Sequence, residues 1–378
     1  MVASGATQLS ADTFTVARPL YGIRYDYLFR VCAVDSAGNR SEWTEQAWSL
    51  GAVDTIPPPP PDTVVVDTLP ADTTPPPSTT QPIPLIDMSD TIAYHGFLGG
   101  LYPGGSNTIP DAQQKRQPPI DGKQRFALLS IGMSNVSEEF CNPGEGLVGP
   151  QACADFSFVG QASASASVND SLVLVNGAQG TKVAVDWDQP NDETYDEADN
   201  RLALFGLAPA DVQAIWLKQV NRGPDVSLPA GDADAYVLLR RLGDIMRAIR
   251  VRYPNVRQLY LSSRIWSCAA PGTTNPEPFA YESGFAVKWL IEAQIRQLAT
   301  GTVDQRAGDL SLNVAPWLAW GPYLWADGRN PRSDGFFWLP RDLRGDCLHP
   351  SESGIEKVGG LLHDFFSTSE LTRTWYLR

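Results

Sequence analysis

Two short segments hold residue types that together can perform nucleophilic catalysis. Ser134 comes two residues after Gly132 at the end of the apolar run 126–132, where a glycine permits a tight turn that exposes a serine hydroxyl. His349 follows Asp346 by three residues in the segment GDCLHP. A carboxylate at this spacing can fix the imidazole tautomer and favour the imidazolium. Each motif alone is common, and an ordinary turn or a solvated loop explains it equally well.

Two further segments offer hydrogen-bond donors, which a serine nucleophile needs for its oxyanion. LVLVNGAQG contains Gly177 and Gly180 just after a second apolar run, and a bare backbone N–H there can approach a ligand closely. AIWLKQVNRGP ends a third run with Asn221, whose amide is a suitable side-chain donor. Individually each is better explained as turn chemistry. All four segments together favour a serine-type active site.

The sequence has only three histidines, so few side chains can act as a base near neutral pH. His363 lies inside an amphipathic stretch and is expected to be structural. His95 has no acidic partner nearby in the sequence. His349 is the histidine with an aspartate three residues before it.

Strands and helices are expected to alternate from residue 86 onward. The expected strands are 126–132, 172–176, 212–218, 256–262 and 310–314, and the expected helices are 233–252, 282–298 and 351–366. Several strands are continuous apolar runs, which is typical of a parallel sheet covered on both faces. The pattern predicts an α/β domain with a three-layer, doubly wound parallel sheet, whose carboxyl edge holds the candidate residues.

In chain order the four segments read GMSN, G-x-x-G, N and D-x-x-H-P, and this order resembles the SGNH (GDSL-like) hydrolase superfamily over most of 86–378. The resemblance implies a flavodoxin-like sheet and a two-step acyl transfer without metal or organic cofactor. It implies that Ser134 is the nucleophile and His349 the general base, with Asp346 orienting the imidazole.

The resemblance also implies an oxyanion hole made by the Ser134 backbone N–H, Gly180 and Asn221. Gly180 is preferred to Gly177 because the family's glycine closes the G-x-x-G turn. Two departures stand out. Met133 replaces the family's usual aspartate, so that GMSN is similar to the GQSN form of the carbohydrate acetylesterase branch, and Asn221 lies in KQVN and not in the common G-x-N-D.

Aromatic residues give the evidence on the substrate. Trp266, Trp317 and Trp320 fall at or just beyond expected strand ends, where their faces can stack on sugar rings. Core packing explains most such residues equally well. The preferred function is hydrolysis of O-acetyl esters on carbohydrates. The alternatives are a carbohydrate-binding or adhesion protein that keeps the fold with a drifted site, and a lipase or thioesterase for longer acyl chains.

The five cysteines form no CxxC or Cys/His cluster, so a structural zinc site is not expected. Cys141 and Cys153 bracket a Gly- and Pro-rich loop that a disulfide closes easily in an oxidising compartment, although two unrelated buried thiols are an equal alternative. Cys268 and Cys347 should both lie at the carboxyl edge of the sheet, where a disulfide would pin the histidine loop. Cys32 is then the odd thiol.

The first 85 residues differ in composition from the rest. Residues 51–85 contain 11 Pro and 7 Thr but no Lys or Arg, which predicts an extended, solvated linker. Residues 1–50 resemble the last strands of a fibronectin type III domain in the run YLFRVCAVDSAGNRS, with Tyr27 as its corner tyrosine. The early strands of such a domain are missing, so the sequence is expected to begin inside it. The domain prediction is 1–50, 51–85 and 86–378.

Overall composition excludes several classes of partner. The formal net charge of −14 argues against binding to nucleic acid or to an anionic membrane, which would repel this surface. No apolar run approaches the roughly 18 residues that cross a bilayer. Hydrophobic residues make up 43% of the chain and charged residues 19%, enough for a sizeable core. A modular enzyme that is secreted, with its signal peptide missing from this sequence, is expected.

Overall fold

The computed structural model describes residues 26–31, 44–49, 76–88, 90–143, 152–270 and 274–378. The chain divides into two units, 1–75 and 76–378. In the first unit, β1 (Asp26–Val31) pairs antiparallel with β2 (Thr44–Ser49). The rest of the expected fibronectin-like run, and the linker up to residue 75, lie outside the described residues, so this resemblance stays a prediction.

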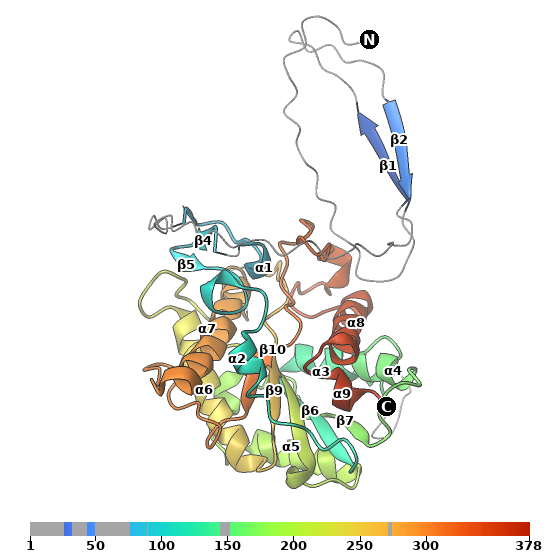
Figure 1. Cartoon of the computed structure of the whole chain (residues 1–378), viewed down its shortest axis with the longest axis vertical. Helices are drawn as coiled ribbons and strands as arrows, with labels where there is room; N and C mark the ends of the chain where they lie inside the picture. The colour runs from blue at the N-terminus through green and yellow to red at the C-terminus, as the bar shows by residue number, and fades with distance from the viewer. Residues whose placement is uncertain (1–25, 32–43, 50–75, 89, 144–151, 271–273) are drawn as a thin grey trace, which may run out of the picture. The chain divides into compact units, whose positions relative to one another are not determined.

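The second unit is built on a five-stranded parallel sheet (Figure 1). Its strands are β6 (Phe126–Gly132), β7 (Leu172–Asn176), β8 (Val212–Lys218), β9 (Gln258–Leu261) and β10 (Trp317–Trp320). They lie in the order β10-β9-β8-β6-β7. Numbered along the chain this is 2-1-3-4-5, the flavodoxin-like order, which confirms the predicted fold class.

Helices cover both faces of this sheet. One face is covered by α5 (Glu193–Leu204), α6 (Asp234–Arg252) and α7 (Phe279–Thr300). The other is covered by α3 (Ser134–Cys141), α4 (Phe158–Ser163), α8 (Glu352–Thr368) and α9 (Arg373–Tyr376). Alternate β6 side chains supply the two cores, because successive residues of a strand point to opposite faces. None of the described helices is long and apolar enough to cross a membrane.

Most expected elements are confirmed. The strands expected at 126–132, 172–176 and 212–218 have the same ends in the structure, and the fourth is shorter than expected. The three long helices agree with the expected ranges to within three residues at each end. Gly301 ends α7 in the left-handed conformation, with φ 77°, as a helix-stopping glycine should.

The strand expected at 310–314 is wrong. This segment forms a turn, in which the backbone N–H of Ser311 donates to Asp309 Oδ1 at 2.8 Å and that of Val314 donates to the Ser311 carbonyl at 3.0 Å. Since these groups are used locally, they cannot join a sheet ladder. The fifth strand begins only at Trp317, after Pro316.

Short elements precede the sheet in the second unit. Strands β3 (Ser78–Thr79), β4 (Ala93–Tyr94) and β5 (Phe97–Leu98) form a small separate sheet. Two single-turn helices flank β4 and β5 in the sequence: α1 (Leu85–Met88) precedes them and α2 (Asp111–Gln114) follows them. Leu85 and Met88 are fully buried, so α1 is part of the main core.

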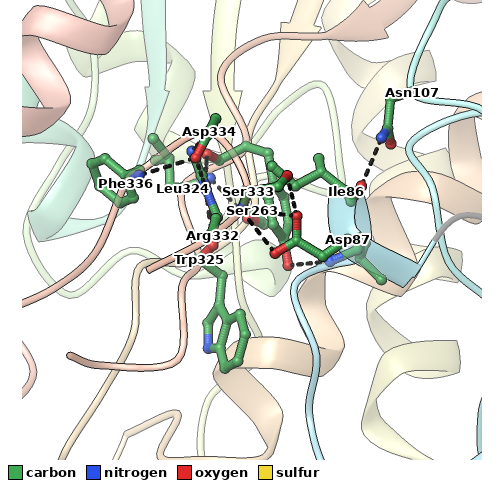
Figure 2. A network of polar contacts seen from close by, with 12 residues as sticks. Ile86, Asp87, Asn107, Ser263, Leu324, Trp325, Arg332, Ser333, Asp334 and Phe336 are labelled. Atoms are coloured by element: carbon green, nitrogen blue, oxygen red, sulfur yellow. Dashed lines mark hydrogen bonds and ion pairs between the residues drawn. The ribbon is translucent and has the colours of Figure 1, made fainter. Parts of the chain in front are cut away.

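A polar network joins α1 to the long segment after β10 (Figure 2). Asp87 accepts hydrogen bonds from the backbone and hydroxyl of Ser333. The neighbouring Arg332, 5% exposed, donates to the carbonyls of Tyr323 and Trp325 at 2.6 and 3.1 Å and pairs with Asp334. One buried guanidinium therefore satisfies carbonyls that regular structure leaves unpaired.

Helix α6 passes very close to the chain before β10, which generates a stability prediction. A Cβ on Gly243 would lie 1.9 Å from the carbonyl oxygen of Ala307, whereas a Cβ on Gly231 would meet nothing within 4 Å. Gly243→Ala should destabilise the fold by about 1–3 kcal/mol through overpacking. Thermal unfolding should show a lower Tm for this variant, and Gly231→Ala is the control. Equal Tm values for the two variants would contradict this account of the packing.

Candidate active site

The candidate residues meet at the carboxyl edge of the sheet, beside its switch point. The chain runs from β6 outward to β7 and then returns to β8 on the other side of β6. Ligand sites of open α/β sheets lie at such points. Gly132 ends β6, and a Cβ there would lie 2.4 Å from Val136 Cγ2 and 2.5 Å from the Lys218 carbonyl oxygen. Only glycine lets α3 begin this close to β8, and Ser134 is the first residue of α3.

Three predicted residues form one continuous chain of hydrogen bonds. Ser134 Oγ lies 2.8 Å from His349 Nε2, across 215 residues of sequence. His349 Nδ1 lies 2.7 Å from Asp346 Oδ2. With the Nδ1 proton donated to the aspartate, Nε2 is left to accept the serine proton. The structure thus brings together the serine, the base and the orienting carboxylate.

Asp346 is held in the charged form. Partial burial would raise its pKa, but hydrogen bonds from the His349 backbone N–H, the imidazole and the Leu348 N–H outweigh burial and lower it to about 2. The two backbone N–H groups both donate to Oδ1 at 3.0 Å, leaving Oδ2 for the imidazole. The carboxylate therefore organises its own loop as well as the histidine ring.

The loop 343–350, called the histidine loop below, is held at several points. The Leu348 carbonyl accepts from Asn135 Nδ2 at 3.1 Å and from Arg264 Nη2 at 2.8 Å. The Cys347 carbonyl accepts from Ser267 Oγ at 3.1 Å. Two adjacent residues of this loop are therefore tied to α3 and to the segment after β9.

Both predicted disulfides are present. Cys268–Cys347 joins the segment after β9 to the histidine loop, two residues from His349. Cys141–Cys153 closes the loop that follows α3. The first bridge supports the expectation that these two cysteines meet at the carboxyl edge of the sheet.

A pocket of about 200 Å³ opens beside Ser134 and His349. Among the described residues its wall consists of Met133, Ser134, Asn135, Gly180, Thr181, Val183, Val220, Arg222, Arg264, Thr274, Asn275, Leu348 and His349. A Cβ on Gly180 would meet nothing within 4 Å, so its backbone faces open space. Ser134 opens a helix, where the first N–H groups lack intrahelical acceptors. Two of the predicted oxyanion donors thus lie in one pocket wall.

Asn221, the third predicted donor, is not part of this wall, and the prediction needs correction. Its Nδ2 donates to Asp234 Oδ1 at 2.9 Å and to the Asp234 carbonyl at 3.2 Å, and its Oδ1 accepts from Arg241 at 2.7 Å. Only 2% of the residue is exposed. Both ends of the amide are used in contacts with α6, so neither N–H of the side chain is left to donate to an oxyanion.

The three tryptophans predicted to bind substrate also lie elsewhere. Trp317 and Trp320 belong to β10 itself, at 0% and 2% exposure, and their indole N–H groups donate to the carbonyls of Gln113 and Leu101. Trp266 is partly buried against Gly328 and does not contribute to the pocket wall. For Trp317 and Trp320 the cause of the error is the misplaced fifth strand, since a strand at 310–314 would have put both residues beyond the sheet edge.

Three side chains at the site were not predicted. Asn135 belongs to the GMSN motif, which was the one available signal for it. Arg264 and Asn275 line the pocket at 2% and 1% exposure, and nothing in their sequence context marks them. Asn275 has a positive φ of 61°, as do Thr181 at 67° and Cys347 at 58°. Strained backbone of this kind gathers at functional sites.

A fully buried ion pair lies beneath the site. Lys218, the last residue of β8, pairs with Glu139 of α3, and neither side chain is exposed. Burial raises the pKa of Glu139 and lowers that of Lys218 to about 8. A broken buried pair leaves an uncompensated charge, so this contact fixes α3 against the sheet.

A second hollow among the residues that the structure describes differs from this site. It has a volume of about 310 Å³, lies at the opposite sheet edge and has Pro118, Arg257 and Trp317 in its wall. This wall contains no serine, cysteine or histidine that could act as a nucleophile or as its base. Within the described ranges, no group of three or more His, Cys, Asp or Glu is arranged to hold a metal ion.

The disulfide at the histidine loop generates a prediction about activity. Replacing Cys268 and Cys347 by serine should lower kcat by about 10- to 100-fold, because small displacements of a catalytic base are costly. Ester hydrolysis by the purified variant measures this. The matched control replaces Cys141 and Cys153, whose bridge lies at the far end of α3, and should have a smaller effect on kcat. Equal losses in the two variants would mean that the first bridge does not position His349.

The charge state of Asp346 generates a prediction about pH. Its pKa is depressed from 3.8 to about 2, so its interactions persist above pH 3.8 and are lost only as the pH falls through about 2. Between about pH 4 and 7 Asp346 should therefore stay charged and keep its hydrogen bonds, so that protonation of this carboxylate does not limit activity in this range. The NMR chemical shift of its carboxyl carbon, followed from about pH 2 to 7, measures this, and a carboxyl group that titrates above about pH 4 would contradict the prediction.

Comparisons with known proteins found similar solved structures but no match by sequence. No family model matches the sequence, and no curated protein matches it. Several solved chains are similar, among them the following two. One is a carbohydrate esterase family 2 enzyme with a carbohydrate binding domain from Corynascus thermopiles (Myceliophthora fergusii), at 13% identity and TM-score 0.31, covering 65% of this chain and 67% of that one. The other is an extracellular lipase from Streptomyces rimosus, at 11% identity and TM-score 0.28, covering 62% and 97%.

Similarity this distant carries no conclusion about activity. The strand order β10-β9-β8-β6-β7 and the helices on both faces stand independently of it. The flavodoxin-like parallel sheet that the sequence predicted is therefore confirmed by the strand order itself.

Proposed function

We propose that this chain is a serine esterase of the SGNH type that removes O-acetyl groups from carbohydrates. The observation that carries the proposal is the hydrogen-bonded chain from Ser134 through His349 to Asp346, with distances of 2.8 and 2.7 Å. Its position at the sheet's switch point, next to a pocket, supports the same reading.

The reaction proceeds in two acyl transfers. Ser134 Oγ attacks the ester carbonyl carbon while His349 Nε2 takes its proton, and Asp346 stabilises the imidazolium. The tetrahedral oxyanion is stabilised by the N–H groups of Ser134 and Gly180 and by the positive end of α3. Collapse leaves the acyl group on Ser134, and His349 protonates the leaving alcohol. Water then repeats the sequence and frees the acid.

The size of the pocket favours a short acyl group. Its volume of about 200 Å³ is below the roughly 300–1,000 Å³ typical of pockets for drug-sized ligands. An acetyl group needs little room, whereas a long acyl chain needs an extended apolar channel. The wall also contains several polar side chains, among them Arg222, Arg264 and Asn275, which suit a hydroxylated alcohol component.

The proposal includes location and domain organisation. Two disulfides in one unit suit an oxidising compartment, so we propose a secreted or extracellular enzyme. We propose 86–378 as the catalytic domain, after the fibronectin-like residues 1–50 and the linker 51–85. Residues 76–85 of this linker belong to the second unit, since Ser78–Thr79 pairs with β4 and Leu85 is fully buried. Small ester substrates are the expected partners.

The test is hydrolysis of p-nitrophenyl acetate and p-nitrophenyl octanoate. The parent should hydrolyse the acetate faster, and Ser134→Ala should lower kcat by about 10⁴-fold or more, because the nucleophile is lost. Ser167→Ala is the matched control, since this exposed hydroxyl contacts only Ser165. Release of p-nitrophenol measures both substrates.

The outcomes separate the competing functions. Faster turnover of the octanoate would favour a lipase or thioesterase. Equal rates for the parent and Ser134→Ala on these esters and on acetylated polysaccharides would overturn the esterase and favour a non-catalytic carbohydrate-binding protein.

A further inference from the structure

Arg264 is a buried cation that lacks an ionic partner. It is 2% exposed and lies in the wall of the pocket that holds Ser134. Its Nη2 donates to the Leu348 carbonyl at 2.8 Å, whereas Nε and Nη1 have no hydrogen-bond partner among the described residues. The one acceptor it contacts is a neutral carbonyl, so its charge is not neutralised by direct contact.

The carboxylates near Arg264 are already used by other groups. Three of them, Glu138, Glu139 and Asp346, have as respective partners Arg344, Lys218 and His349. A fourth, Glu277, accepts hydrogen bonds from two backbone N–H groups and from the Trp325 indole. Burial raises the pKa of Glu277 to about 7, which weakens it further as a counter-ion near neutral pH.

An unpaired guanidinium in a protein interior is costly. Burial lowers the pKa of Arg264 to about 10, which reflects this cost. Such groups are kept where a ligand supplies the missing charge. This chain has a net charge of −14, but the described pocket wall holds two arginines and no carboxylate. They are the 2% exposed Arg264 and the 60% exposed Arg222, which pairs with Asp186 at 3.4 Å.

Asn275 provides the second unpartnered group. It is 1% exposed, lies in the same wall, and neither its Nδ2 nor its Oδ1 has a partner among the described residues. An amide beside a guanidinium can complete the hydrogen bonding of a carboxylate, which accepts several donors. No tryptophan belongs to the described wall, so tryptophan rings do not stack on a sugar in this pocket.

We propose that Arg264 binds a carboxylate of the substrate, with Asn275 and Arg222 assisting, so that the enzyme deacetylates acidic sugars of the uronic acid class. This rests on the proposed esterase function and specifies its substrate. The carboxylate occupies the pocket next to the ester that Ser134 attacks, and it supplies the anion that the protein itself does not place against Arg264.

The test compares two O-acetylated methyl glycosides, one of glucuronic acid and one of glucose. The two sugars differ in carrying a carboxylate or a hydroxymethyl group at the same carbon. The parent should show a kcat/KM about 10- to 100-fold higher for the acidic substrate, the range expected for a hydrogen bond to a charged group. Arg264→Gln should remove most of this ratio, and Arg264→Lys should keep part of it.

Arg296→Gln is the matched control, because this cation lies on α7 and pairs with Asp304 outside the pocket. It should leave the ratio unchanged. Circular dichroism and Tm check that the Arg264 variants fold. Equal kcat/KM for the two substrates in the parent would overturn the proposal. So would an Arg264→Gln variant that loses both activities equally, since Arg264 would then only hold the histidine loop.

A binding measurement separates failure of this proposal from failure of the esterase. Isothermal titration of the Ser134→Ala variant with the acetylated glucuronoside should give a Kd about tenfold or more below that of the glucoside, and Arg264→Gln should abolish the difference. If the parent hydrolyses neither substrate but this difference is found, the carboxylate site stands and the esterase fails. If hydrolysis depends on Ser134 and binding shows no difference, the esterase stands and the carboxylate site fails.

Discussion

The site depends on how the Leu348 carbonyl is held. The histidine loop has no regular secondary structure, so its shape comes from individual contacts. The Leu348 carbonyl accepts from Asn135 on α3 and Arg264 after β9, which places the next residue, His349, against the first residue of α3. A loop tied at a single atom to two different elements cannot shift relative to either. The disulfide at Cys347 adds a covalent tie beside it.

Charge explains why an acidic chain has a pocket lined by cations. The carboxylates around the catalytic chain are each neutralised in place, by Lys218 beneath α3 and by Arg344 at the surface. Asp346 is used by His349 and by two backbone N–H groups. The positive charge of Arg264 is left over, and it lies where a substrate can reach it. In the proposed function the same guanidinium both holds the loop that carries His349 and binds the carboxylate of the substrate.

Much of the site could be predicted because short-range pattern fixes it. The apolar run 126–132 and the glycine that ends it place Ser134 at the carboxyl edge of the sheet. The spacing of Asp346 and His349 lets one carboxylate bind both the ring and the loop backbone. The tryptophans were misplaced because apolar pattern alone could not show that the polar groups around Ser311 close a turn and not a strand.

The sequence by itself determined the parallel sheet and the candidate residues Ser134, His349 and Asp346, because apolar runs and D-x-x-H spacing are local properties of the chain. The tertiary structure alone decided which donors face the pocket. Asn221 is turned away because Asp234 and Arg241 take both ends of its amide, and Arg264 is turned inward without a counter-ion. Which partner a polar side chain finds depends on residues distant in sequence, and no local pattern records that competition.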